Sequence, residues 1–118
     1  MTDNYKQQLI LAGVDINSAI DRFMGNEIMY NKFLLRFLKD DSFSNLENCI
    51  VSNEYQMAFM QAHTMKGVAA NLGLDCLLDI LTPMTEQLRS NDLVNISEEI
   101  KELKLRYEMI CNIIRATD

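Results

Sequence analysis

The chain contains a single histidine, His63, and Lys66 follows it by three residues. Residues three apart on a helix are neighbours on one face, so the ammonium group would lie beside the imidazole ring. Two groups that can both be cationic gain no stability from this proximity, whereas a lysine can hold an anionic group on the ring. A neutral imidazole carries a nucleophilic lone pair near neutral pH. The pair therefore predicts a histidine that carries an anionic group, with Lys66 stabilising the negative charge.

Gly67 is the next residue of this pattern. A glycine inside a helix costs about 1 kcal/mol relative to alanine, so folding alone gives no reason for it. Next to His63, the absence of a side chain would leave room for a bulky group delivered to the ring. We therefore interpret Gly67 as a clearance residue.

The helix that must position these residues is predicted to span 54–72 and to end at Gly73, which can adopt the left-handed conformation. Its core row, laid out at helical spacing, consists of Ala58, Gln61, Met65, Val68 and Leu72. His63 lies off that row and is expected to face water or a partner. Phe59 and Met60 also lie off it. Either the row is rotated by one residue, or these two side chains and Ala70 form an apolar docking patch beside His63.

Helical periodicity recurs along nearly the whole chain, and one proline and four glycines leave little material for the turns of a β fold. Asp15 or Asn17, Asn26 and Asp75 are suitable helix caps. Pro83 is expected to kink the helix that follows Asp75. We predict one all-α domain over residues 1–118, an up-and-down antiparallel four-helix bundle with two short N-terminal helices packed across one end.

The motif resembles that of the histidine-containing phosphotransfer (HPt) domain family. The similar residues are His63, Lys66 and Gly67, Leu72 and Gly73, Glu86 and Arg89, with Phe23, Gly25 and Tyr30 in an entry segment over 16–30. The resemblance implies a carrier that accepts a phosphoryl group on His63 from the aspartyl phosphate of a response-regulator receiver domain and passes it to another receiver. It implies Lys66 as the phosphoryl-stabilising cation and Arg89 as a further site residue, although Arg89 near a helix end is also explained by the helix dipole.

Composition and charge limit the partners and cofactors. Lys plus Arg is 11 and Asp plus Glu is 17, so the net charge of −6 argues against nucleic acid. Three widely spaced cysteines suggest neither a disulfide framework nor a zinc site, and they favour the cytoplasm. No membrane span, metal site or nucleotide motif is expected. We expect a monomer without kinase activity or cofactor of its own. The resemblance implies response-regulator receiver domains as partners, with Mg²⁺ bound only by the receiver domain, and a hybrid sensor histidine kinase as a further partner.

Two other functions stay open at this stage. The first is a helical adaptor that docks a receiver domain without being phosphorylated. The second is an enzyme that uses His63 as a general base, which requires a carboxylate within hydrogen-bond reach of the ring.

Overall fold

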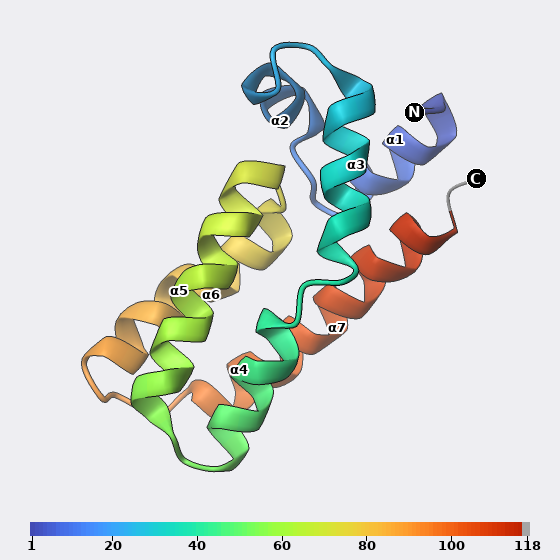
Figure 1. Cartoon of the computed structure of the whole chain (residues 1–118). Coiled ribbons are helices and arrows are strands. Elements are labelled where there is room, and N and C mark those ends of the chain that lie inside the picture. Colours follow the sequence, from blue (N-terminus) through green and yellow to red (C-terminus); the bar gives the residue numbers. More distant parts are fainter. Residues whose placement is uncertain (117–118) are drawn as a thin grey trace.

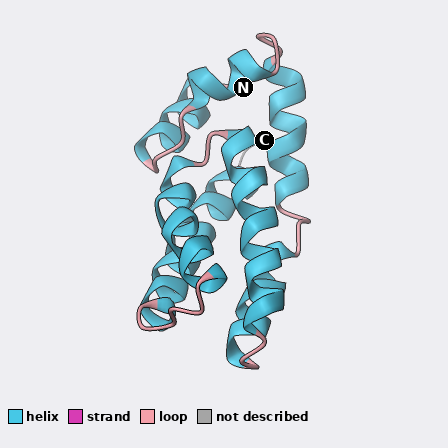
Figure 2. Ribbon diagram, turned by 90° about the vertical axis from the view of Figure 1, so that its left-hand side faces the viewer, coloured by secondary structure: helices cyan, strands magenta, loops and turns pink. Residues whose placement is uncertain are grey.

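The computed structural model describes residues 1–116, and this part of the chain is all-helical, as the sequence predicts (Figures 1 and 2). No strand occurs within it. Its helices are α1 (Asp3–Leu11), α2 (Ile16–Arg22), α3 (Glu27–Phe37), α4 (Ser42–Val51), α5 (Tyr55–Leu72), α6 (Asp75–Arg89) and α7 (Ile96–Arg115).

The helix starts follow the predicted capping chemistry in part. The side chain of Asp15 accepts a hydrogen bond from the Ser18 amide at 3.2 Å, and that of Asn26 accepts one from the Met29 amide at 3.0 Å. Both residues therefore act as predicted N-caps. The prediction for Asp75 is wrong by one residue, because Leu74 precedes α6 and Asp75 is its first residue.

The four C-terminal helices pack as successive neighbours. In Figure 1, α5 lies beside both α4 and α6, and α6 also packs against α7. Contact between α4 and α7 comes from the stacked rings of Phe43 and Tyr107, 4.5 Å apart, and from an ion pair of 3.3 Å between Lys104 and Glu47. The third helix, α3, lies above α4 in Figure 1 and contacts both α5 and α7.

The two short N-terminal helices are joined to the rest of the molecule through loops as well as side chains. α1 contacts α7, and α2 contacts α5. The Asp15 amide donates to the Gly73 carbonyl at 2.8 Å, and the Cys76 amide donates to the Gly13 carbonyl at 3.0 Å. This pair of hydrogen bonds links the α1–α2 loop to the α5–α6 loop. It also explains why α6 needs no side-chain cap, since Gly13 satisfies an amide of its first turn.

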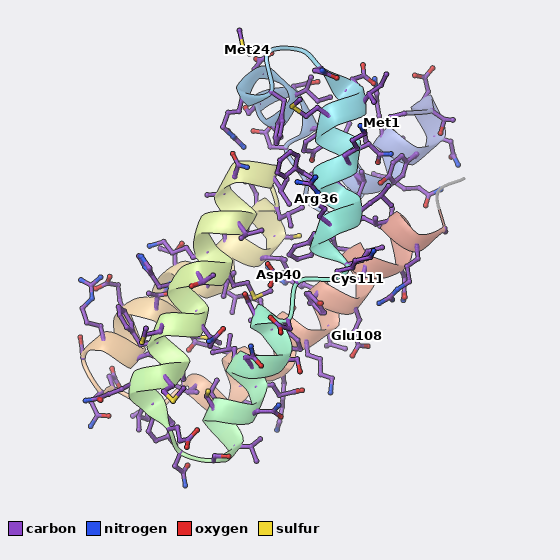
Figure 3. All side chains as sticks on the ribbon, viewed as in Figure 1. Met1, Met24, Arg36, Asp40, Glu108 and Cys111 are labelled. Atoms are coloured by element: carbon purple, nitrogen blue, oxygen red, sulfur yellow. The ribbon has the colours of Figure 1, made fainter. Side chains whose placement is uncertain are left out.

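The interior is apolar and includes all three cysteines, which are free and buried, in agreement with their interpretation as small hydrophobic residues. One of them, Cys111, is labelled on α7 in Figure 3. The same figure shows Met24 at the outer tip of the α2–α3 turn, where its side chain is 94% exposed. α6 continues through Pro83 to Arg89. Among residues 1–116, no helix is both long enough and apolar enough to cross a membrane.

Candidate functional site

The helix that carries His63 ends where the sequence predicts. Gly73 follows α5 with a φ of 73°, in the left-handed region that favours glycine. A Cβ atom at this position would lie 2.5 Å from the backbone oxygen of Asp15. Both the backbone conformation and the contact with the α1–α2 loop therefore require glycine here.

Side chains from α2 and α3 hold the C-terminal end of α5. The guanidinium of Arg22 donates to the carbonyls of Ala70 at 2.8 Å and of Asn71 at 3.2 Å. The buried hydroxyl of Tyr30 donates to the carbonyl of Leu72 at 2.7 Å. Side chains distant in sequence thus donate to three consecutive carbonyls of the last turn of α5, where a helix lacks its full set of backbone donors. Sequence reasoning missed this role of Arg22, because no local pattern indicates a partner almost 50 residues away.

The inner face of α5 differs from the predicted core row. The buried residues are Ala58, Ala62, Met65, Ala69 and Leu72, whereas Gln61 and Val68 are only half-buried. The row is therefore rotated at two positions toward alanines. α5 packs against both α4 and α6, and small side chains allow two neighbouring helices to approach closely. The predicted core row contains Val68 because valine has more apolar surface than alanine. Sequence spacing alone does not show that close helix packing requires the smaller Ala69.

His63 lies on the outer face of α5 and is exposed, as predicted. Lys66 is half-buried one turn further along, and neither side chain has a hydrogen bond or an ion pair within residues 1–116. A Cβ atom added to Gly67 would meet no atom within 4 Å. The surface beside the imidazole is therefore open, and both side chains are available to a group from outside.

The Phe59 ring contacts both His63 and Arg89, which is a second cationic side chain near the imidazole besides Lys66. The rings of Phe59 and His63 are stacked, with centroids 6.0 Å apart and planes inclined by 23°. The guanidinium carbon of Arg89, at the end of α6, lies 5.6 Å from the centroid of the Phe59 ring. Arg89 is also paired with Glu86 at 3.3 Å. Arg89, Phe59 and His63 thus form a row across the surfaces of α6 and α5.

The three candidate docking residues occupy different environments. Phe59 is half-buried and packs against the core, so the core row is indeed rotated toward it. Met60 is exposed and lies one turn from His63. Ala70 is exposed but lies two turns beyond His63, about 10 Å along the helix axis, next to Arg22. An apolar surface beside His63 therefore consists of Met60 and the accessible part of Phe59.

Within residues 1–116, no group of three His, Cys, Asp or Glu side chains is placed to hold a metal ion. Searches with this chain found no matching family model, curated protein or solved structure.

Proposed function

We propose that this protein is a histidine phosphotransfer carrier, which accepts a phosphoryl group on His63 and passes it between receiver domains of a phosphorelay. The observation that carries the proposal is the exposed His63 in the middle of α5, with Lys66 one turn away and open space over Gly67. The proposal also rests on the resemblance of these residues to the HPt motif.

In the proposed reaction, the Nε2 lone pair of a neutral His63 attacks the phosphorus of an aspartyl phosphate. An N–P bond forms as the P–O bond to the aspartate breaks, and the aspartate leaves as a carboxylate. The proton on Nδ1 stays on the ring, so no base is required on this chain. Transfer to a second receiver reverses the same bond changes. Such a transfer depends mainly on positioning and on positive charge around the phosphoryl oxygens.

This chain would supply two cations to that transfer. Lys66 would contact the phosphoryl group directly, since it shares the face of His63. Arg89 would act from the other side, where it lies over the Phe59 ring that stacks on the imidazole. Phe59 would also restrict the rotation of the His63 ring, which favours one approach direction for the phosphorus.

The arrangement that we propose for the helices is an up-and-down four-helix bundle of α4, α5, α6 and α7. The packing of each helix on the next, together with the Phe43–Tyr107 stack and the Lys104–Glu47 ion pair between the first and the last, supports it. A bundle gives the middle of α5 a rigid frame, which suits a residue that must meet two partners in turn.

The test is incubation of the full chain with receiver domains that carry a radiolabelled aspartyl phosphate. We expect label on the chain that is lost in acid and retained in alkali, as phosphohistidine requires. The variant His63→Gln should take up no label, because the chain has no second histidine. Label on the His63→Gln variant would contradict the proposal. So would a wild-type chain that acquires no label from any receiver domain tried.

The adaptor function is the alternative, and the exposed Met60 beside His63 is the observation that favours it. An adaptor would bind a receiver with equal affinity in wild type and His63→Gln and would acquire no phosphate. Met60→Ser should weaken binding in either case, since Met60 is exposed and offers an apolar contact. The phosphate assay therefore separates the two functions.

A further inference from the structure

A cavity of about 650 Å³ opens between α1, the start of α6 and α7. Its apolar walls include Leu11, at the end of α1, and Leu105 and Met109 on α7, which are 78%, 63% and 53% exposed. Leu105 and Met109 are one helical turn apart and so form a continuous strip along α7. The cavity is therefore a groove with large apolar side chains that nothing in residues 1–116 covers.

The groove is distant from the His63 surface. Asp79 lines the groove, while Arg89 at the far end of the same helix lies over Phe59. Ten residues of α helix separate them, which is about 15 Å along the axis of α6. A partner in this groove therefore would not need to contact the imidazole.

The groove is also acidic. Three carboxylates line it, on Asp75, Asp79 and Glu102, and Arg106 is the one basic side chain among its described lining residues. The charge of Arg106 is already engaged, since its guanidinium donates to Glu102 at 3.0 Å and to the Cys76 carbonyl at 2.9 Å. Burial raises the pKa of Asp75, and the negative charges of Asp15 and Asp79 raise it further, while Arg22 lowers it. Within residues 1–116, the carboxylates of Asp75 and Asp79 therefore form no ion pair with Arg106, and a cationic group from a partner could pair with them.

We propose that this groove binds a cationic amphipathic helix of a partner protein. The apolar face of that helix would cover Leu11, Leu105 and Met109, and its lysine or arginine side chains would pair with Asp75 and Asp79. A second copy of this chain is a poor occupant, because it carries a net charge of −6 and would meet negative charge with negative charge.

The test uses the full chain and a fluorescently labelled synthetic helix with leucines on one face and lysines on the other. We expect saturable binding by fluorescence anisotropy, weakened by added salt. A peptide of the same composition with its leucines spread around the helix should bind about tenfold more weakly. No saturable binding, or equal binding of both peptides, would overturn the proposal.

Variants of the chain locate the binding surface. Leu105→Lys should weaken binding about tenfold, since it removes an apolar contact and repels the lysines of the probe. Val94→Lys is the matched control, because Val94 is exposed in the loop before α7, outside the groove, and it should leave the affinity unchanged. Equal losses in these two variants would show a nonspecific charge effect and overturn the proposal.

A charge variant tests whether the groove carboxylates contribute to binding of the probe, and NMR locates the bound probe. Asp79→Asn should weaken binding about threefold and reduce its salt dependence, whereas Glu54→Gln at the start of α5 should do neither.

In amide NMR spectra the probe should shift the signals of Leu105 and Met109 and leave those of Met60 and His63 unchanged. Shifts confined to the His63 surface, or a chain that dimerises through Leu105, would overturn the proposal. His63→Gln should bind the probe as wild type does, so this result is independent of phosphotransfer.

Discussion

The two faces of α5 differ in what determines their residue types. The inner face presents Ala58, Ala62 and Ala69, all fully buried between neighbouring helices. The outer face presents an exposed His63 and an open Gly67. Packing explains the alanines of the inner face, because small side chains allow neighbouring helices to approach closely. It explains neither outer residue, and a residue that the fold does not require is a better indicator of function than one that it does.

The effect of an alanine substitution on stability at Gly73 and at Gly67 measures this difference between packing and function. Gly73 has a positive φ and would clash with Asp15 if it carried a Cβ atom, whereas a Cβ atom on Gly67 would meet nothing. The same substitution should therefore have opposite effects at the two positions.

Gly73→Ala should destabilise the protein by about 3 kcal/mol. The left-handed conformation costs an alanine roughly 1–2 kcal/mol, and the contact with a backbone oxygen adds the cost of overpacking. Urea unfolding followed by circular dichroism measures the change. A loss below about 1 kcal/mol would mean that the α1–α2 loop can move away from α5.

Tyr30→Phe should cost about 1.5 kcal/mol, because it leaves the buried carbonyl of Leu72 without its hydrogen bond. Tyr55→Phe is the matched control, since its hydroxyl donates to Asn53 in an exposed pair. Equal unfolding free energies for the two variants would show that the support for the end of α5 does not depend on this bond.

Glu99→Gln tests whether a half-buried polar contact between α6 and α7 can be improved. Gln87 donates to one oxygen of Glu99 at 3.0 Å, but the other oxygen of Glu99 and the oxygen of Gln87 are buried without a partner. Burial raises the pKa of Glu99, the hydrogen bond from Gln87 lowers it, and Asp92 raises it. The folded state therefore holds the proton more tightly than the unfolded state does. This contribution to stability is complete below the ordinary pKa of glutamate and is lost as the pH rises through the raised value.

A glutamine at position 99 stays neutral and can donate to Gln87. The variant should be more stable than wild type by about 1 kcal/mol at pH 7, and the difference should shrink as the pH is lowered toward about 4. Glu98→Gln is the control, because Glu98 is exposed and pairs only with Lys101. A difference that does not depend on pH would contradict the role of protonation.

Gly67→Ala should stabilise the protein by about 0.5–1 kcal/mol, the difference in helix propensity at an open position. If clearance is the reason for the glycine, the same variant should take up phosphate from a receiver more slowly. A stabilised variant with unchanged transfer would leave Gly67 without a functional reason.

His63→Gln and Lys66→Ala should change the unfolding free energy by no more than about 0.5 kcal/mol, since His63 is exposed and alanine is a better helix former than the lysine it replaces. His63→Gln should nevertheless abolish phosphate uptake, and Lys66→Ala should slow it. Thermal unfolding and the phosphate assay on the same samples check both statements. A large loss of stability in His63→Gln would make this histidine structural.

Local signals in the sequence predict the helices well. The Asn26 cap, the end of α5 at Gly73 and the exposure of His63 all follow from a few neighbouring residues. Each depends on interactions within one or two helical turns, and this explains why the pattern alone is sufficient.

Interactions between distant segments account for what the sequence did not reveal. The Gly13 carbonyl takes the place of a cap by Asp75, and Arg22 pairs with carbonyls of α5. The choice of Ala62 and Ala69 over Gln61 and Val68 for the core depends on how closely α4 and α6 approach. Spacing along the chain contains no information about such contacts. The row of Arg89, Phe59 and His63 was only partly predicted, because it combines two helices.

The two hydrogen bonds between the α1–α2 and α5–α6 loops have a consequence for the order in which the molecule opens. They join residues about 60 positions apart in the chain, Asp15 to Gly73 and Cys76 to Gly13. Short helices such as α1 and α2 normally fray on their own, and their amides exchange with solvent deuterium rapidly. Here the amides of Asp15 and Cys76 become free only when the N-terminal segment separates from the start of α6. Their exchange should therefore be as slow as that of the central amides of α5, so that the N-terminal segment and the α5–α6 region unfold as one cooperative unit.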